Sequence, residues 1–152
     1  MVFLLFTVGH ERYALESSQI VEVVPLVELI QVPKAPAYLA GVFTYRGTLV
    51  PVLDLGQLMH SQPCPTRLST RIVLVNYPGG DGTRHILGLM AEHVTDTVTK
   101  EPTDFAPVGM SVEGAPYLGG ILTDEHGMLQ RVRVEHLLPT AVRATLFADL
   151  ED

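Results

Sequence analysis

The side chains that could do chemistry in this sequence are six histidines, scattered carboxylates and one cysteine, and their spacing fits no common catalytic or metal site. None of the histidines is spaced with a second histidine, cysteine or carboxylate as metal ligands are. Cys64 lies between two prolines with no adjacent basic side chain to activate it. The glycine-rich run 79–82 precedes Thr83 and a predicted strand, not the lysine and helix of a phosphate-binding loop. These patterns predict no catalytic residue, no metal and no cofactor, and they favour a binding module.

One charged residue, Arg46, stands at the tip of an otherwise apolar hairpin. Residues 42–45 and 49–53 are rich in β-branched and aliphatic side chains, which predicts two strands. Gly47 favours a tight turn between them, because glycine adopts positive φ without steric cost. Pro51 cannot donate to a ladder, so we expect its strand at a sheet edge or at a bulge. The planar fork of an arginine can hold a carboxylate, a carbonyl or an amide in two places. Arg46 is therefore our candidate partner-facing residue, with a merely solvated turn residue as the alternative.

Around this hairpin the sequence predicts an all-β fold with a few short helices. Asp54 is a suitable N-cap for a short helix with Leu55, Leu58 and Met59 on one face. Further one-turn helices are expected near residues 17–18 and 135–138, and a terminal helix at 140–150. Strands are expected at residues 2–8, 13–15, 20–24, 27–32, 42–45, 49–53, 71–77, 85–90, 94–98, 117–123 and 128–134.

The second half of the chain repeats features of the first. Residues 38–44 (YLAGVFT) match residues 117–123 (YLGGILT), and both lead into a turn, an aliphatic strand and a Leu-rich helical turn. A period of about 75–80 residues suggests two similar β subdomains; the alternative is chance similarity between hairpins. We expect subdomains at residues 1–62 and 71–139, joined by a linker at 60–70, with strand exchange between them possible. At the second turn Glu125 replaces Arg46, and a purely structural turn would not need opposite charges.

Composition limits the function classes. The 152 residues carry a net charge of −7 without a Lys/Arg cluster, which disfavours binding to nucleic acid or to an anionic membrane. Only 18% of residues are charged, below the usual ~25%, which suggests surfaces covered by partners. The apolar run at the N-terminus is too short to span a membrane, so no membrane insertion is expected. A single cysteine excludes a disulfide framework and indicates a reducing compartment.

These residues resemble the CheW-like family of chemosensory adaptors. The most specific match is Arg46-Gly47 followed by residues 50–55 (VPVLDL), framed by Gly41-Val42. Supporting matches lie at residues 13–15, 20–23, 32–33, 36–38, 87–89, 94–96, 117–118 and 134–138. The resemblance covers residues 3–138 and implies two five-stranded, SH3-like β-barrels packed on one another.

The resemblance also implies a function. Such adaptors are non-enzymatic and couple the cytoplasmic tips of methyl-accepting receptors to a CheA-type histidine kinase, whose regulatory domain has the same fold. The expected location is cytoplasmic, at receptor arrays beneath the inner membrane. The receptor tip, a helical hairpin, is expected to dock in the groove between the barrels. The receptor-side positions correspond to Ile20, Glu22, Gly41 and Arg46, with Leu87, Gly88 and Leu89 lining the same groove.

Three alternatives stay open at this point. The tyrosine before Arg46 resembles adaptors of alternative systems, such as Wsp-type surface sensing that feeds cyclic-di-GMP synthesis. The chain could also be a coupling domain detached from a larger kinase. From another class, it could be a small-ligand sensor or a hydrolase that uses the groove between the barrels.

Overall fold

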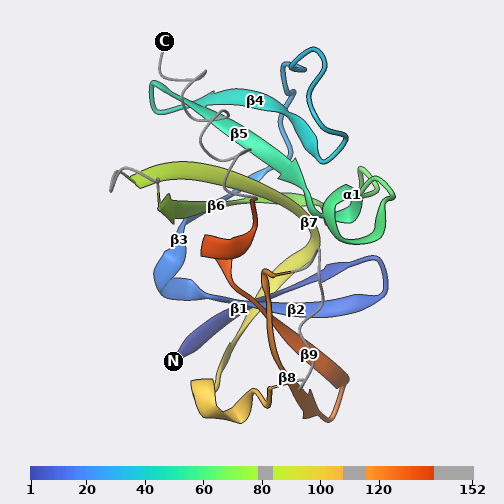
Figure 1. The fold of residues 1–152 in the computed structure, drawn as a ribbon, viewed down its shortest axis with the longest axis vertical. Helices are drawn as coiled ribbons and strands as arrows, with labels where there is room; N and C mark the ends of the chain where they lie inside the picture. Colours follow the sequence, from blue (N-terminus) through green and yellow to red (C-terminus); the bar gives the residue numbers. More distant parts are fainter. Residues whose placement is uncertain (79–83, 108–115, 139–152) are drawn as a thin grey trace.

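The computed structural model of the chain describes residues 1–78, 84–107 and 116–138, and these residues form a mainly β fold (Figure 1). The strands are β1 (Val2–Val8), β2 (Glu11–Glu16), β3 (Ile20–Pro25), β4 (Leu39–Tyr45), β5 (Thr48–Asp54), β6 (Arg71–Pro78), β7 (Arg84–Thr99), β8 (Leu118–Asp124) and β9 (Gly127–Val132). The helical segments are α1 (Leu55–His60) and three 3₁₀ turns, η1 (Ser17–Gln19), η2 (Pro102–Asp104) and η3 (Val134–His136). The predicted fold class is confirmed. The helix predicted at 140–150 lies outside the described residues.

The strands form two five-stranded sheets that share β7 (Figure 1). One sheet has the order β3-β6-β7-β5-β4, and the other has the order β7-β1-β2-β9-β8. The first part of β7 pairs with β6, and the part from Glu92 onward pairs with β1. The change occurs at His93, where a φ of 51° and a shift of register bend the strand. The two strands predicted at 85–90 and 94–98 are therefore one continuous strand.

The two halves of the chain each contribute strands to both sheets. β1 and β2, from the first half, pair with β7 and β9, whereas β3, β4 and β5 lie in the other sheet. β2 and β9 are parallel, as are β5 and β7, so these pairings join strands that are far apart in sequence. The division into residues 1–62 and 71–139 stays a prediction, and both of these stretches contribute strands to each sheet.

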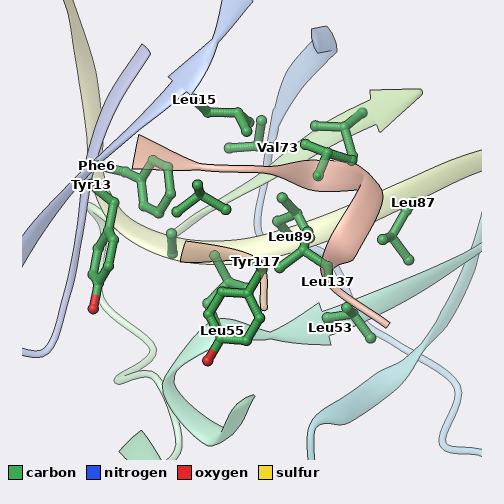
Figure 2. Packing of buried hydrophobic residues seen from close by; sticks show 14 of the residues in the cluster. Phe6, Tyr13, Leu15, Leu53, Leu55, Val73, Leu87, Leu89, Tyr117 and Leu137 are labelled. Atoms are coloured by element: carbon green, nitrogen blue, oxygen red, sulfur yellow. The ribbon is translucent and has the colours of Figure 1, made fainter. Parts of the chain in front are cut away.

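A single hydrophobic cluster joins the two sheets (Figure 2). Its buried members include Phe6, Tyr13 and Leu15 from one sheet and Leu53 and Leu89 from the other. β6 is buried on both faces. Alternate side chains of a strand point to opposite sides of the sheet. Its odd-numbered positions 73, 75 and 77 face this cluster, whereas positions 72 and 74 face a second, smaller cluster. The barrels therefore pack through a common core.

The structure reproduces the sequence repeat in detail. Ile30 forms a single β-bridge to Val42, and Ala106 forms the equivalent bridge to Ile121. A Cβ on Gly41 would lie 2.7 Å from the Ile30 carbonyl oxygen, and one on Gly120 would lie 2.7 Å from the Ala106 oxygen. Each glycine therefore allows a neighbouring segment to approach the first strand of its hairpin.

Two local predictions differ from the structure. Residues 27–32 do not form a strand, since they pair only at Ile30, next to a register shift in β4. Pro25 and Pro33 also remove backbone donors at both ends of this segment. β5 is not an edge strand, because it pairs with both β4 and β7. Pro51 is accommodated because the pairing with β7 begins one residue later, at Val52.

Candidate functional site

The turn between β4 and β5 places Arg46 at its tip in an unusual backbone conformation. Arg46 has a φ of 50° and Gly47 a φ of 81°, and Tyr45 pairs with Thr48 on either side. Two consecutive residues with positive φ make the mirror-image turn that matches the twist of a β-hairpin. Positive φ is uncommon outside glycine, asparagine and aspartate. The hairpin therefore holds this arginine in a defined place.

Arg46, Tyr45 and Glu22 form one polar cluster on the surface, which we call the tip cluster. The Tyr45 hydroxyl donates a hydrogen bond to the Glu22 carboxylate. The Arg46 guanidinium lies 3.7 Å from the same carboxylate oxygen, and its carbon lies 5.1 Å from the centre of the Tyr45 ring. The hydrogen bond to Glu22 raises the pKa of Tyr45, and the positive charge of Arg46 partly opposes this rise. The cluster links β3 to β4, the two strands at opposite ends of their sheet order.

The charges of the tip cluster face solvent. The Arg46 side chain is 77% exposed and that of Glu22 is 43% exposed. At 3.7 Å the pair is an ion pair without a hydrogen bond, and such exposed pairs contribute little to stability, about 0–1 kcal/mol. Most donors of the Arg46 fork are thus free of partners within the described residues, so they are available to a second molecule.

The structure brings together only some of the predicted site residues. Glu22 and Arg46 are in contact, and Ile20, two residues before Glu22 on β3, is half-buried against the common core. The other four predicted residues are buried: Gly41, Leu87, Gly88 and Leu89. Leu87 and Leu89 belong to the common core, so their side chains do not line an open groove as expected.

The two buried glycines act within the chain. A Cβ on Gly88 would lie 3.0 Å from side-chain atoms of Ile72 and Val52, and Gly41 packs against the Ile30 backbone. Gly41, which we expected at a receptor-side position, therefore allows a close approach by another segment of its own chain. Both glycines are thus buried against other segments of the same chain.

Tyr45 is a site residue that the sequence reasoning missed. An aromatic residue directly before the tip arginine was the available signal, because arginine packs on aromatic faces. Gln19, which precedes Ile20 in the sequence, lines a cavity of about 240 Å³ together with Asn76 and Arg84.

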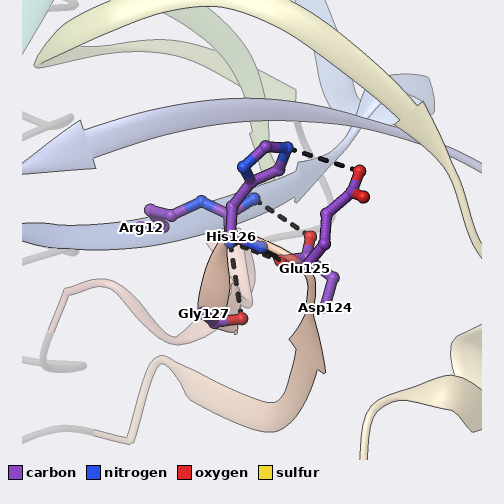
Figure 3. Close-up of polar contacts among 5 residues, drawn as sticks. All are labelled: Arg12, Asp124, Glu125, His126 and Gly127. Carbon is purple, nitrogen blue, oxygen red and sulfur yellow. Dashed lines mark hydrogen bonds and ion pairs between the residues drawn. The ribbon is translucent and has the colours of Figure 1, made fainter.

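The second hairpin turn is anchored differently (Figure 3). Arg12, on β2, donates two hydrogen bonds of 2.9 and 3.1 Å to the Asp124 carboxylate, which also accepts the His126 backbone N–H at 2.8 Å. The hydrogen bond from Arg12 lowers the pKa of Asp124 to about 2. Glu125 remains exposed and lies 3.4 Å from the His126 ring. The two turns thus present opposite charges to solvent, as their sequences predicted.

Two kinds of site are absent from the described ranges. No three histidine, cysteine or carboxylate side chains in residues 1–78, 84–107 and 116–138 are grouped so that they could hold a metal ion. Within the same ranges, no helix is both long enough and apolar enough to cross a bilayer.

The fold and the tip cluster together define a two-barrel protein with an exposed polar cluster, Glu22, Tyr45 and Arg46, on its surface. The CheW-like domain profile matches residues 2–142, and the chain belongs to the CheW-like domain family. This family placement indicates a non-enzymatic adaptor and argues against the hydrolase alternative.

Known proteins agree with this placement. A "Chemotaxis protein CheW" from Klebsiella aerogenes is 28% identical over 138 residues, covering 90% of this chain and 80% of the relative. "Protein FrzA" of Myxococcus xanthus is 28% identical over 124 residues, covering 82% and 69%. The crystal structure of the "scaffolding protein TtCheW" from Thermoanaerobacter tengcongensis superposes with a TM-score of 0.77 at 21% identity, covering 91% of this chain and 87% of that one. That structure supports the two-barrel fold.

Proposed function

We propose that this protein is a coupling adaptor that binds the cytoplasmic tip of a methyl-accepting chemoreceptor and the regulatory domain of a CheA-type histidine kinase. The observation that carries this proposal is the exposed tip cluster, in which most donors of Arg46 are free of partners within the described residues. The curated relatives, several of which are chemotaxis proteins, support the same role. The expected location is the cytoplasm, in receptor arrays beneath the inner membrane.

The receptor surface, in this proposal, consists of Arg46, Tyr45, Glu22 and Ile20. The guanidinium would hold a carboxylate or carbonyl of the receptor hairpin, and Glu22 would fix orientation by pairing with a basic or amide group. Ile20 would add apolar contact. Gly41, Leu87, Gly88 and Leu89 keep a supporting role, because burial allows them to position the hairpin and β3 without touching the receptor.

Receptor binding by the tip cluster is tested with Arg46→Ala. The exposed side chain makes few contacts, so the free energy of unfolding should change by less than about 0.5 kcal/mol. Loss of a partner-facing arginine should weaken binding to a receptor hairpin fragment by at least about tenfold, or about 1.4 kcal/mol. Calorimetric titration of the fragment measures the affinity, and urea unfolding measures the stability.

The matched control is Glu125→Ala, at the equivalent exposed turn of the other barrel, which should leave receptor binding unchanged. Glu22→Gln should weaken binding in the same direction as Arg46→Ala. If both tip variants bind the fragment as the wild type does, the site assignment fails.

The kinase, we propose, contacts a strip of exposed apolar residues along β3 and the segment after it. Val21, Val23, Val27, Ile30 and Val32 are all at least 37% exposed. Exposed apolar side chains that a partner could cover are typical of protein interfaces. Ile30→Asp, at a side chain that is 69% exposed, should reduce binding to the kinase regulatory domain and leave receptor binding intact. If Ile30→Asp instead weakened receptor binding and left kinase binding intact, the receptor and kinase surfaces would have to be assigned the other way round.

The output of the system is open to a direct test. Co-purification with receptor and kinase fragments from a chemotaxis system and from a Wsp-type system would show which of them binds. Binding to the Wsp-type fragments alone would place the adaptor upstream of cyclic-di-GMP synthesis.

A further inference from the structure

A pocket of about 330 Å³ lies where the two barrels meet, away from the tip cluster; we call it the junction pocket. The turn between β1 and β2 contributes Gly9, and α1 contributes Gly56. The segment between α1 and β6 contributes Cys64 and Arg67, and the bend of β7 contributes Glu92. Both barrels therefore supply its walls, and its volume lies in the range of small-ligand sites, roughly 300–1,000 Å³.

Glu92 gives this pocket an unsatisfied acceptor. Its side chain is only 5% exposed, and its Oε1 atom has no hydrogen-bond partner among the described residues. An ionised carboxylate has only acceptor sites, and burial without donors is strongly unfavourable. Among the described residues, the cation within ion-pair distance is the Arg67 guanidinium, 3.7 Å from Oε1, which is too far for a hydrogen bond. The Oε1 atom of Glu92 therefore lacks, among the described residues, the donor that a buried carboxylate oxygen requires.

Arg67 is poorly placed to be the permanent partner of Glu92. Its side chain is 66% exposed, so it can move away without uncovering buried apolar surface. It nevertheless shows that a guanidinium can approach Glu92 from the mouth of the pocket. A free guanidinium could come closer and donate two parallel N–H bonds, the geometry that carboxylates favour.

The surroundings favour a cation over an anion. Asp54 is buried next to the pocket, where its carboxylate accepts hydrogen bonds from the backbone of Cys64 at 3.1 Å and of Gln57 at 3.2 Å. Burial, followed by the negative charges of Asp54 and Glu92, raises the pKa of Cys64 to about 12. The carboxylates of Asp54 and Glu92 thus outnumber the Arg67 guanidinium, with the lining histidines His10, His60 and His93 counted as neutral. A metal ion is a poor fit, because no three His, Cys, Asp or Glu side chains of the described ranges are grouped so that they could hold one.

We propose that the junction pocket binds a guanidinium or primary ammonium group, which pairs with Glu92 and displaces Arg67. The group belongs either to a small molecule or to a side chain of a bound partner. This role is separate from receptor binding by the tip cluster, because the pocket shares no residue with it.

The test uses methylguanidinium chloride as the probe, with tetramethylammonium chloride, a cation without N–H donors, as the matched control. Titration of the full chain is followed by the backbone amide signals of Gly9, Gly56 and His93 in NMR spectra. Methylguanidinium should cause saturable shifts of these signals at millimolar concentration, and tetramethylammonium should not. Equal shifts with both salts, or no saturation, would overturn the proposal.

Two variants make the test specific. Arg67→Ala removes the internal competitor and should tighten methylguanidinium binding several-fold. Glu92→Gln removes the charge and should abolish the saturable shifts while the rest of the spectrum stays folded. If Glu92→Gln does not fold, the test depends on Arg67→Ala alone. Methylguanidinium binding that is unchanged or weaker in that variant would contradict the displacement of Arg67.

The source of the group is decided by binding assays with Glu92→Gln or, if it does not fold, with Arg67→Ala. Unchanged affinity for both receptor and kinase fragments assigns the pocket to a small molecule. A changed affinity for one fragment assigns the group to a lysine or arginine of that fragment.

Discussion

At the scale of single residues, Asp124 shows how one charge can anchor a turn. Its folded pKa of about 2 lies below the ordinary value of 3.8, since Arg12 holds the ionised form. A lowered folded pKa means that the stabilisation is present above about pH 4. It is lost as the pH falls through about 2, when the folded state also takes up the proton.

Asp124→Asn should therefore destabilise the protein at pH 7 and have little effect near pH 2. We expect a loss of about 1 kcal/mol at pH 7, a modest value because solvent screens a pair that is partly exposed. Urea unfolding followed by circular dichroism at several pH values measures the difference. Glu125→Gln, at the exposed neighbour, serves as the control and should show no such pH dependence. An undiminished difference at pH 2 would contradict the ion-pair explanation.

Cys64 should be chemically inert in the folded protein. Its pKa of about 12, raised mainly by burial, leaves almost no thiolate at pH 8, whereas a free thiol has a pKa of about 8.5. Alkylation by iodoacetamide at pH 8 should be at least about a hundredfold slower in the folded protein than in urea. Mass spectrometry of timed samples measures both rates. Comparable rates would show that the segment between α1 and β6 opens readily.

At the scale of the elements, the repeat rests on two equivalent glycines. Gly41→Ala should destabilise the protein by about 2 kcal/mol, because the new Cβ meets the Ile30 carbonyl at 2.7 Å and φ is 152°. Gly120→Ala should have a similar effect through the Ala106 carbonyl. Thermal and urea unfolding measure both losses.

Gly47→Asn is the control for these two variants. Gly47 also has positive φ, but nothing lies within 4 Å of an added Cβ, and asparagine is tolerated in such turns. This variant should change the stability by less than about 0.5 kcal/mol. A neutral Gly41→Ala would mean that the segment before β4 can move away.

Most elements could be predicted from local pattern, and the exceptions have local causes. The N-cap role of Asp54 is confirmed by its hydrogen bond from the Gln57 backbone, because capping depends on neighbours in sequence. The continuity of β7 was missed because a bend at a non-glycine residue, His93, leaves no sequence signal. The strand predicted at 27–32 was wrong because its pairing depends on a distant bulge in β4.

At the scale of the whole molecule, the shared strand β7 and the common core should make unfolding one cooperative transition. Residues 1–62 alone would lack β6, β7 and β9, with which their strands pair. Neither 1–62 nor 71–152 should therefore fold by itself. Circular dichroism and tyrosine fluorescence of the intact chain should give coincident unfolding curves. Two separate transitions, or a folded fragment, would show that the barrels are independent.

The sequence alone determined the class of fold, the repeat, the adaptor family and two members of the tip cluster, Glu22 and Arg46. Periodicity, turn residues and short motifs carry these properties, and they depend on near neighbours. The tertiary structure decided that Tyr45 joins those two residues and that Leu87 and Leu89 are buried. It also decided that both parts of the chain contribute strands to each sheet and that the buried Glu92 lines a pocket. These properties depend on contacts between residues far apart in the chain, which no local pattern encodes.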